Sequence, residues 1–271
     1  MHPTRGARGE PPLRPAAGTG PFSLPDGVVH LWPIALDQPP SVVATLHTTL
    51  DPGERRRAAE HGDAALSRRF VVARGVARVV LGRYLDRPAA SLCWSTGRWG
   101  KPALADAATL CFNLAHTADV ALLAITGGRP VGVDIERRRT GFPATTFADR
   151  YFPAVERDLV RTGGPDAFLR LWTRKEAWVK AAGDRVGRGL ALPVAGTGPV
   201  LPVRDPAGRI PGSWLLHDLP APPGHAACVA LAGTRPVRPL WPATTVSTPP
   251  FLHLNIPDRC FFHVAEPFCP T

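Results

Sequence analysis

The stretch that decides the fold lies at residues 110–136, and its second part reads Val120-Ala-Leu-Leu-Ala-Ile-Thr-Gly-Gly-Arg-Pro-Val-Gly-Val-Asp-Ile-Glu136. Apolar runs at 120–126 and 131–136 predict two short strands, because β-branched residues favour extended backbone. Gly127-Gly128 between them predicts a turn. A further strand signal at 110–114 completes the stretch, which is expected to form a meander of neighbouring strands.

Blocks of helix and strand signals flank this stretch on both sides. Asp51-Pro52-Gly53-Glu54 has the residues of a helix start, with Asp as the cap and Pro at the first helical position. Gly183 is placed to end a helix. Each half of the chain therefore predicts helices packed on an antiparallel sheet, and the fold class is α+β. The other expected elements are strands at 28–32, 91–94, 214–218 and 226–232, and helices at 66–85, within 145–160, and at 166–182.

Composition divides the chain into four expected segments. Residues 1–27 are rich in Pro, Gly and Arg and predict a disordered leader. An N-terminal half is expected at 28–133 and a C-terminal half at 134–234. Residues 235–271 lose periodicity and predict a Pro-rich tail outside the fold, so that a chain ending at Thr234 should still fold and function.

The overall composition excludes several classes of protein. No apolar run approaches the roughly 20 residues of a membrane-spanning helix, and the first residues lack the apolar segment of a secretion signal. The five cysteines form no C-x-x-C pair, which favours a reducing cytoplasm over a disulfide framework or zinc site. The net charge of +10 fits nucleic acid, an anionic membrane, an acidic protein or a polyanionic small molecule, but equally an ordinary solvated surface.

Lysine is scarce in this chain. Only Lys101, Lys175 and Lys180 occur among 32 basic residues. Lysine carries a compact charge on a flexible stem, whereas arginine is a rigid planar fork. The three lysines are therefore candidates for positions that require a compact ammonium group, although each one could also be placed by chance.

Asp134 and Glu136 are the first candidates for chemistry. Side chains alternate along a strand, so these two carboxylates share one face while Val133 and Ile135 face the core. Adjacent carboxylates repel each other, and Mg²⁺ is a cation that prefers such oxygen ligands. The alternative is an ordinary exposed strand edge, with Glu136 paired to the arginines that follow it.

The helix at 166–182 supplies the second group of candidates. Trp172, Glu176 and Lys180 are spaced by four residues and lie on one stripe of the helix. Glu176 and Lys180 could simply form a helix-stabilising ion pair. That alternative is weakened because Lys175 and Lys180 both belong to the scarce lysines.

Four motifs in order resemble the signature of Sfp-type 4′-phosphopantetheinyl transferases. They are Gly100-Lys101-Pro102, Phe112-Asn113-Leu114-Ala115-His116-Thr117, Gly132-Val133-Asp134-Ile135-Glu136, and Trp172-x-x-Lys175-Glu176-Ala177-x-x-Lys180-x-x-Gly183. The last resembles the branch that serves secondary-metabolite and fatty-acid carrier proteins. The resemblance covers roughly residues 28–233. Each motif alone is weak, but four in register are specific.

The resemblance implies transfer of the phosphopantetheine arm of coenzyme A to a serine of an acyl- or peptidyl-carrier protein. It implies that Asp134, Glu136 and Glu176 hold Mg²⁺ against the pyrophosphate and that Lys180 binds a pyrophosphate oxygen. Glu176 is the candidate base for the serine, directly or through a water. Asp134 and Lys180 thus also belong to the coenzyme A site.

The remaining coenzyme A contacts follow from the same resemblance. Lys101, His116 and Thr117 are expected near the 3′-phosphate and adenosine end, with help from arginines of the N-terminal helices, Arg57, Arg69 and Arg74. His116 could instead be a capping or core histidine, and Arg69 and Arg74 could be solvated helix charges.

The family fold implies two similar halves that form a pseudo-dimer within one chain, with coenzyme A between them and a monomer as the default state. The expected partner is an acidic carrier protein. Two alternatives stay open, a basic nucleic-acid-binding protein and a homologue that binds coenzyme A and carrier without turnover. A nucleic-acid role lacks any recognisable motif, and no membrane partner is expected.

Overall fold

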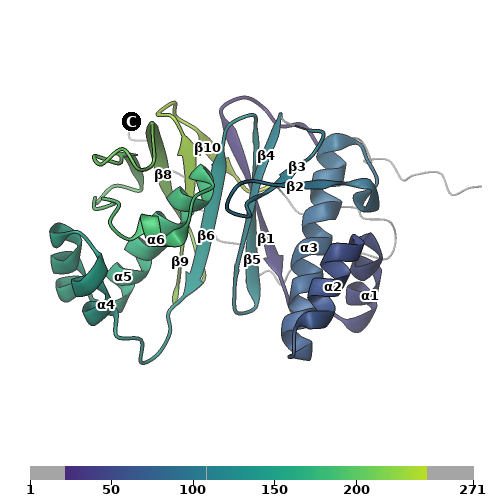
Figure 1. Cartoon of the computed structure of the whole chain (residues 1–271), viewed down its shortest axis with the longest axis horizontal. Helices are drawn as coiled ribbons and strands as arrows, with labels where there is room; N and C mark the ends of the chain where they lie inside the picture. Colours follow the sequence, from purple (N-terminus) through teal and green to yellow (C-terminus); the bar gives the residue numbers. More distant parts are fainter. Residues whose placement is uncertain (1–21, 108, 243–271) are drawn as a thin grey trace, which may run out of the picture.

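The computed structural model of the chain describes residues 22–107 and 109–242, except the side chain of Val186. Two four-stranded, mainly antiparallel sheets with helices on their outer faces build most of this part of the molecule (Figure 1). None of its helices carries an apolar run long enough to cross a lipid bilayer.

The first half begins with one strand, continues with helices and ends with a hairpin. Its main sheet has the order β10-β1-β5-β4, in which β5 is antiparallel to both β1 and β4. A separate ribbon consists of β2 and β3. The elements are β1 (Val28–Ala35), α1 (Pro40–Thr49), α2 (Pro52–Glu60), α3 (Ala64–Leu85), the 3₁₀ turn η1 (Ala89–Ser91), β2 (Trp94–Thr96), β3 (Pro102–Leu104), β4 (Leu110–Thr117) and β5 (Val120–Gly127).

The second half repeats this arrangement. Its sheet has the order β6-β9-β8-β7, so that its first strand again pairs with its last, as β1 pairs with β5. The α+β prediction is confirmed, and the two halves share their core topology. The elements are β6 (Val131–Arg137), α4 (Ala144–Tyr151), α5 (Ala154–Ala182, kinked at Gly164), α6 (Val186–Gly189), β7 (Val200–Arg204), β8 (Ser213–Leu219) and β9 (His225–Ala232), followed by β10 (Arg238–Leu240), which returns to the first sheet.

The two sheets pack face to face. Val29 and Leu31 of β1 contribute to one apolar core with Val133 and Ile135 of β6. The other face of the first sheet is covered by α1, α2 and α3, and that of the second sheet by α4 and α5 (Figure 1). The molecule is therefore a four-layer α/β/β/α structure in which each half covers a face that would otherwise be exposed.

The expected meander at 110–136 is only partly present. β4 and β5 form an antiparallel hairpin, but β6 pairs with β9 and belongs to the other sheet. Gly128, with a positive φ of 68°, reverses the chain between β5 and β6. The second half therefore begins at β6, and the expected boundary between residues 133 and 134 falls inside that strand.

Both ends of the described chain take part in the fold further than expected. Phe22, assigned to the leader, packs against Trp32 and Tyr84, and its N–H donates to the carbonyl of Arg83. Residues 238–240, assigned to the tail, form β10 parallel to β1. A three-residue strand is too short to show periodicity in a sequence. Residues 1–21 and 243–271 lie outside the described residues.

A chain that ends at Thr234 is now expected to be less stable than one that ends at Pro242. The shorter chain loses β10 and two partly buried side chains, Val237 and Trp241, that pack on the core between the sheets. Burial of one large apolar side chain contributes about 1.5–3 kcal/mol. Urea unfolding of the two truncated proteins should show a difference of this size, and equal midpoints would contradict a role for β10.

Candidate functional site

The site begins on β6, where the alternation predicted from sequence is confirmed. Val133 and Ile135 point into the core between the sheets. Gly132, Asp134 and Glu136 therefore lie on the opposite face, toward α5. Asp134 is almost completely buried, with 2% of its surface exposed, whereas Glu136 is partly exposed.

Gly132 lets α5 lie directly on this face. A Cβ atom at position 132 would be 2.2 Å from both the carbonyl oxygen of Ala177 and the amide nitrogen of Ala181. No side chain fits in such a gap, so the helix backbone rests on the strand backbone. This close approach brings Glu176 and Lys180 of α5 next to Asp134.

Lys180 is the centre of the resulting charge cluster. Its Nζ lies 2.5 Å from Oδ1 of Asp134 and 4.0 Å from Oε2 of Glu176. The second carboxylate oxygen of Asp134, Oδ2, is buried and has no hydrogen-bond partner among the described residues. An acceptor left in this state favours the approach of a further cation or donor.

The acidic groups of the cluster resist ionisation. Burial raises the pKa of Asp134 to about 6 and that of Glu176 to about 7. Lys180 opposes both shifts, and the neighbouring carboxylates add to them. One ammonium group therefore does not neutralise three acidic side chains. A divalent cation would reduce the remaining repulsion between the carboxylates.

The three carboxyl groups do not form a ready-made metal site. Within 22–107 and 109–242, no three acidic, cysteine or histidine side chains converge in a geometry that could hold a metal ion. The donor set of Asp134, Glu136 and Glu176 nevertheless suits Mg²⁺, which binds through a few carboxylates together with phosphate oxygens and waters.

β4 is attached to β6 at two points and completes the site. Oδ1 of Asn113 accepts a hydrogen bond of 2.8 Å from the amide of Val133. At the end of the strand, Oγ1 of Thr117 donates to Oε2 of Glu136 over 3.0 Å. Sequence reasoning did not assign a role to Asn113, although an amide side chain inside an apolar strand was a signal that it bonds to a neighbouring backbone.

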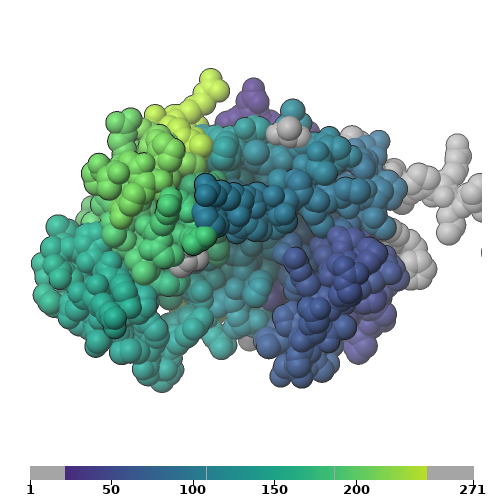
Figure 2. Space-filling view, viewed as in Figure 1, coloured from purple at the N-terminus to yellow at the C-terminus, as the bar shows by residue number. Residues whose placement is uncertain are grey.

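A cavity of about 510 Å³ opens beside this junction, between α3 and the end of β4. It lies where the two halves meet, at a recess along the lower edge of the molecule (Figure 2). Its polar lining includes five of the predicted coenzyme A residues or metal ligands and two further side chains: Arg69, Arg74, His116, Thr117 and Glu136, together with His61 and Arg139.

The predicted residue Arg74, on the cavity wall, is a cation available to an anion. It forms no salt bridge within the described part of the chain, and burial lowers the pKa of its guanidinium group. Arg69, by contrast, is held by Asp37 through two hydrogen bonds of 2.8 and 2.9 Å.

His116 and Arg57 are the other predicted residues near this cavity. Partial burial of His116, together with the charge of Lys180, lowers the pKa of its imidazole. Arg57 is exposed and does not line the cavity, but its charge reaches Arg74.

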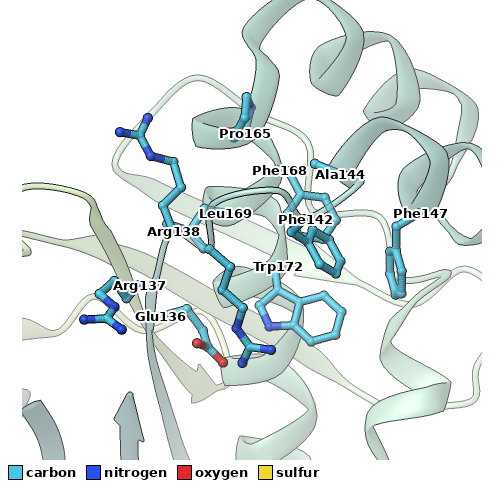
Figure 3. Close-up of a pocket in the computed structure, with 11 residues that line it drawn as sticks. Glu136, Arg137, Arg138, Phe142, Ala144, Phe147, Pro165, Phe168, Leu169 and Trp172 are labelled. Atoms are coloured by element: carbon cyan, nitrogen blue, oxygen red, sulfur yellow. The ribbon is translucent and has the colours of Figure 1, made fainter. Parts of the chain in front are cut away.

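A second, apolar cavity of about 170 Å³ adjoins the first, because Glu136 and Arg139 line both. Phe142, Phe168 and Trp172 gather on one side of it, and Glu136 stands on the other (Figure 3). The polar cavity thus meets the aromatic one at Glu136 and Arg139.

The other two lysines are not part of this charge cluster. Lys175 is 2% exposed, and its Nζ is 2.6 Å from Oε2 of the buried Glu156, so it has a structural role. Lys101 was expected at the 3′-phosphate, but its ammonium group donates to the carbonyl oxygens of Val131 and Ala181, each at 2.9 Å. The hairpin that carries Lys101 packs against the second half. The Gly100-Lys101-Pro102 motif alone does not predict where this hairpin docks.

Comparisons with known proteins point to one family. Residues 130–220 match the model of the 4′-phosphopantetheinyl transferase superfamily. Over 213 residues the chain is 35% identical to the 4′-phosphopantetheinyl transferase HetI of Nostoc sp., an alignment that covers 76% of this chain and 88% of HetI. It is 30% identical over 121 residues to Sfp of Bacillus subtilis, which covers 43% of this chain and 51% of Sfp. With AcpT of Salmonella typhimurium it shares 37% identity over 110 residues, 39% of this chain and 56% of AcpT.

Proposed function

The chain belongs to the 4′-phosphopantetheinyl transferase superfamily, and from this membership we infer that it transfers the phosphopantetheine group of coenzyme A to carrier proteins. The observation that carries this function to named residues is the cluster of Asp134, Glu176 and Lys180, at the line where β6 and α5 touch. Glu136, on the same face of β6 as Asp134, lines both a cationic cavity and an apolar one, which suits a substrate with a charged end and a long uncharged arm.

We propose that Asp134, Glu136 and Glu176 hold Mg²⁺. The unpartnered Oδ2 of Asp134 and the raised pKa values of Asp134 and Glu176 support this assignment. When bound, the ion would neutralise negative charge on the pyrophosphate oxygens. Lys180 already contacts the same carboxylates, and its compact ammonium is suited to a phosphate oxygen.

The reacting hydroxyl comes from a carrier-protein serine. Its oxygen attacks the β-phosphorus of coenzyme A, the bond from that phosphorus to the bridging oxygen breaks, and 3′,5′-ADP leaves. The hydroxyl proton needs an acceptor, and a positioned carboxylate is a common general base. We assign this role to Glu176, directly or through a water. Mg²⁺ on the same carboxylate would lower its pKa, which makes the water relay chemically easier.

Coenzyme A is assigned to the two joined cavities. The phosphates and adenosine fit the larger one, where Arg69, Arg74 and His116 supply positive or hydrogen-bonding groups. The uncharged pantetheine arm fits the aromatic cavity beside Trp172. Because the second half already covers the inner face of the first sheet, we propose that the protein is a monomer. We further propose that its partners are acidic carrier proteins and that it acts in the cytoplasm.

One experiment tests the function as a whole. The protein is incubated with an apo-carrier protein, coenzyme A and Mg²⁺, and the intact mass of the carrier is measured. We expect the mass to rise by one phosphopantetheine, with release of 3′,5′-ADP. An unchanged carrier mass across several acyl- and peptidyl-carrier proteins would contradict the transferase assignment.

Arg74→Met is predicted to raise the KM for coenzyme A about tenfold while kcat changes little. A remote phosphate contact binds the substrate and the transition state equally, and the loss of such a contact appears in KM. A charge-assisted hydrogen bond contributes about 1.5–3 kcal/mol, and the lower end of this range corresponds to a tenfold change. Steady-state kinetics at two salt concentrations checks it, because salt should weaken wild-type binding more than that of the variant.

Arg68→Met is the matched control for this prediction. Arg68 lies on the same helix, α3, but it is exposed and does not line the cavity. Its replacement removes the same charge from the molecule without removing a cavity contact. Equal KM values for the two variants would show that net charge, not the Arg74 contact, governs binding.

A further inference from the structure

The β2–β3 hairpin reaches from the first half to the second. Its turn is closed by two backbone hydrogen bonds of 2.9 Å, from Gly97 to Lys101 and from Gly100 to Gly97. Gly100 has a positive φ of 83°, a conformation that glycine adopts without strain. The hairpin lies across the front of the molecule, with its blue tip against the green second half (Figure 2).

Lys101, at the end of this turn, joins the two elements that carry the charge cluster. Val131, whose carbonyl accepts one of its hydrogen bonds, starts β6 three residues before Asp134. Ala181, which accepts the other, directly follows Lys180 on α5. One ammonium group from the first half thus connects the strand of one site residue to the helix of another.

The position of Ala181 explains why an ammonium group is used here. The last four carbonyls of a helix have no partner within the helix, and α5 ends at Ala182. The C-terminal end of a helix also carries partial negative charge. Lys101 satisfies one of these carbonyls, and its stem lies against Gly183, where an added Cβ would be 3.5 Å from Cδ of Lys101.

Trp99 provides a second contact between the hairpin and the end of α5. The guanidinium carbon of Arg185 lies 3.6 Å from the centre of the Trp99 ring, and that of Arg98 lies 4.8 Å from it. Such cation–π contacts contribute most where water is partly removed. The segment just after α5 is therefore held by the hairpin at two neighbouring points.

We propose that Lys101 is a positioning residue that fixes β6 against the end of α5, and that it is not a ligand of coenzyme A. The proposal rests on the proposed transferase function, which defines Asp134 and Lys180 as site residues. Two of the three ammonium hydrogens are already used by backbone carbonyls.

The proposal makes a kinetic prediction opposite to that of a phosphate contact. Displacement of a catalytic group by about 1 Å lowers the rate of the chemical step by up to a hundredfold. Lys101→Met should therefore lower kcat roughly ten- to hundredfold and leave the KM for coenzyme A within about twofold of wild type. The loss should be equal for coenzyme A and for dephospho-coenzyme A, which lacks the 3′-phosphate.

Amide hydrogen exchange of the full chain gives a readout that does not need activity. Loss of the Lys101 contacts should speed exchange in residues 176–182 and 131–137 and leave β4 and β5 unchanged. Trp99→Ala loosens the same junction without touching Lys101, and it should show the same pattern more weakly. Ser95→Ala, an exposed position on β2, is the control that should match wild type in both measurements.

The outcomes separate the two claims. A rise in the KM for coenzyme A alone, with kcat and dephospho-coenzyme A kinetics unaffected, would overturn the positioning role and make Lys101 a 3′-phosphate ligand. Unchanged exchange in 176–182 in both hairpin variants would also overturn it. A wild-type protein that transfers nothing would instead refute the proposed function, while hydrogen exchange would still decide the role of Lys101. If Lys101→Met does not fold, exchange in Trp99→Ala decides.

Discussion

Glu176→Gln is expected to lower the rate of phosphopantetheine transfer roughly 10²–10⁴-fold, the range typical for removal of a general acid–base group. Glutamine keeps the size of the side chain but can neither accept the serine proton nor contribute charge to a metal ion. The substitution thus removes both proposed roles of this buried side chain at once. Single-turnover transfer followed by carrier mass measures the effect.

Glu60→Gln provides the control, because Glu60 is exposed on α2 and remote from the cluster.

Asp134→Ala should abolish turnover, since it removes the buried partner of Lys180. Glu136→Ala should be milder, because Mg²⁺ replaces a missing carboxylate by water. Circular dichroism should show an intact fold for all of these variants. Full wild-type turnover in excess EDTA would contradict the metal assignment, and an active Glu176→Gln would contradict the assignment of the base.

The features that sequence predicted best are those determined within a few residues. Asp51 and Glu54 were expected to start a helix, and each side chain accepts a hydrogen bond from the backbone of the other. Gly183 was expected to end a helix, and it adopts the left-handed conformation at the end of α5. Both depend on local backbone geometry, for which the sequence holds all the necessary information.

The assignment of strands to sheets was less predictable. β5 and β6 are both apolar, and Gly127-Gly128 marks the turn between them, which is also the pattern of a hairpin. Whether the second strand stays in its sheet or crosses to another depends on which partner strand it finds. For β6 that partner is β9, nearly 90 residues further along the chain. A local pattern does not contain this choice.

The candidate site shows the same division. The spacing of Asp134 and Glu136 on a strand, and of Glu176 and Lys180 on a helix, correctly indicated which side chains share a face. The structure brings Asp134, Glu176 and Lys180 together as expected, and their roles stay a prediction. The direction of Lys101 was not foreseen, because it depends on where the β2–β3 hairpin docks.

Gly132→Ala is expected to damage both stability and activity, because Gly132 sets the distance between β6 and α5. The added methyl group would stand 2.2 Å from two backbone atoms of α5, which no rotamer change relieves. The helix must move away from the strand. Overpacking of this kind costs about 1–3 kcal/mol and sometimes more. The same shift separates Lys180 from Asp134, so transfer by the folded fraction should fall by about a hundredfold.

Gly62→Ala is the matched control, since a Cβ at position 62 would meet no atom within 4 Å and the residue has no positive φ. Urea unfolding and single-turnover transfer of both variants, at a temperature where each is folded, separate the two effects. Gly132→Ala should lose stability and also show a slower chemical step, whereas Gly62→Ala should match wild type in both. If Gly132→Ala lost stability but kept its rate per folded molecule, the contact between β6 and α5 would be structural only. The close approach of the two backbones would then not be what positions Lys180 and Glu176 for transfer.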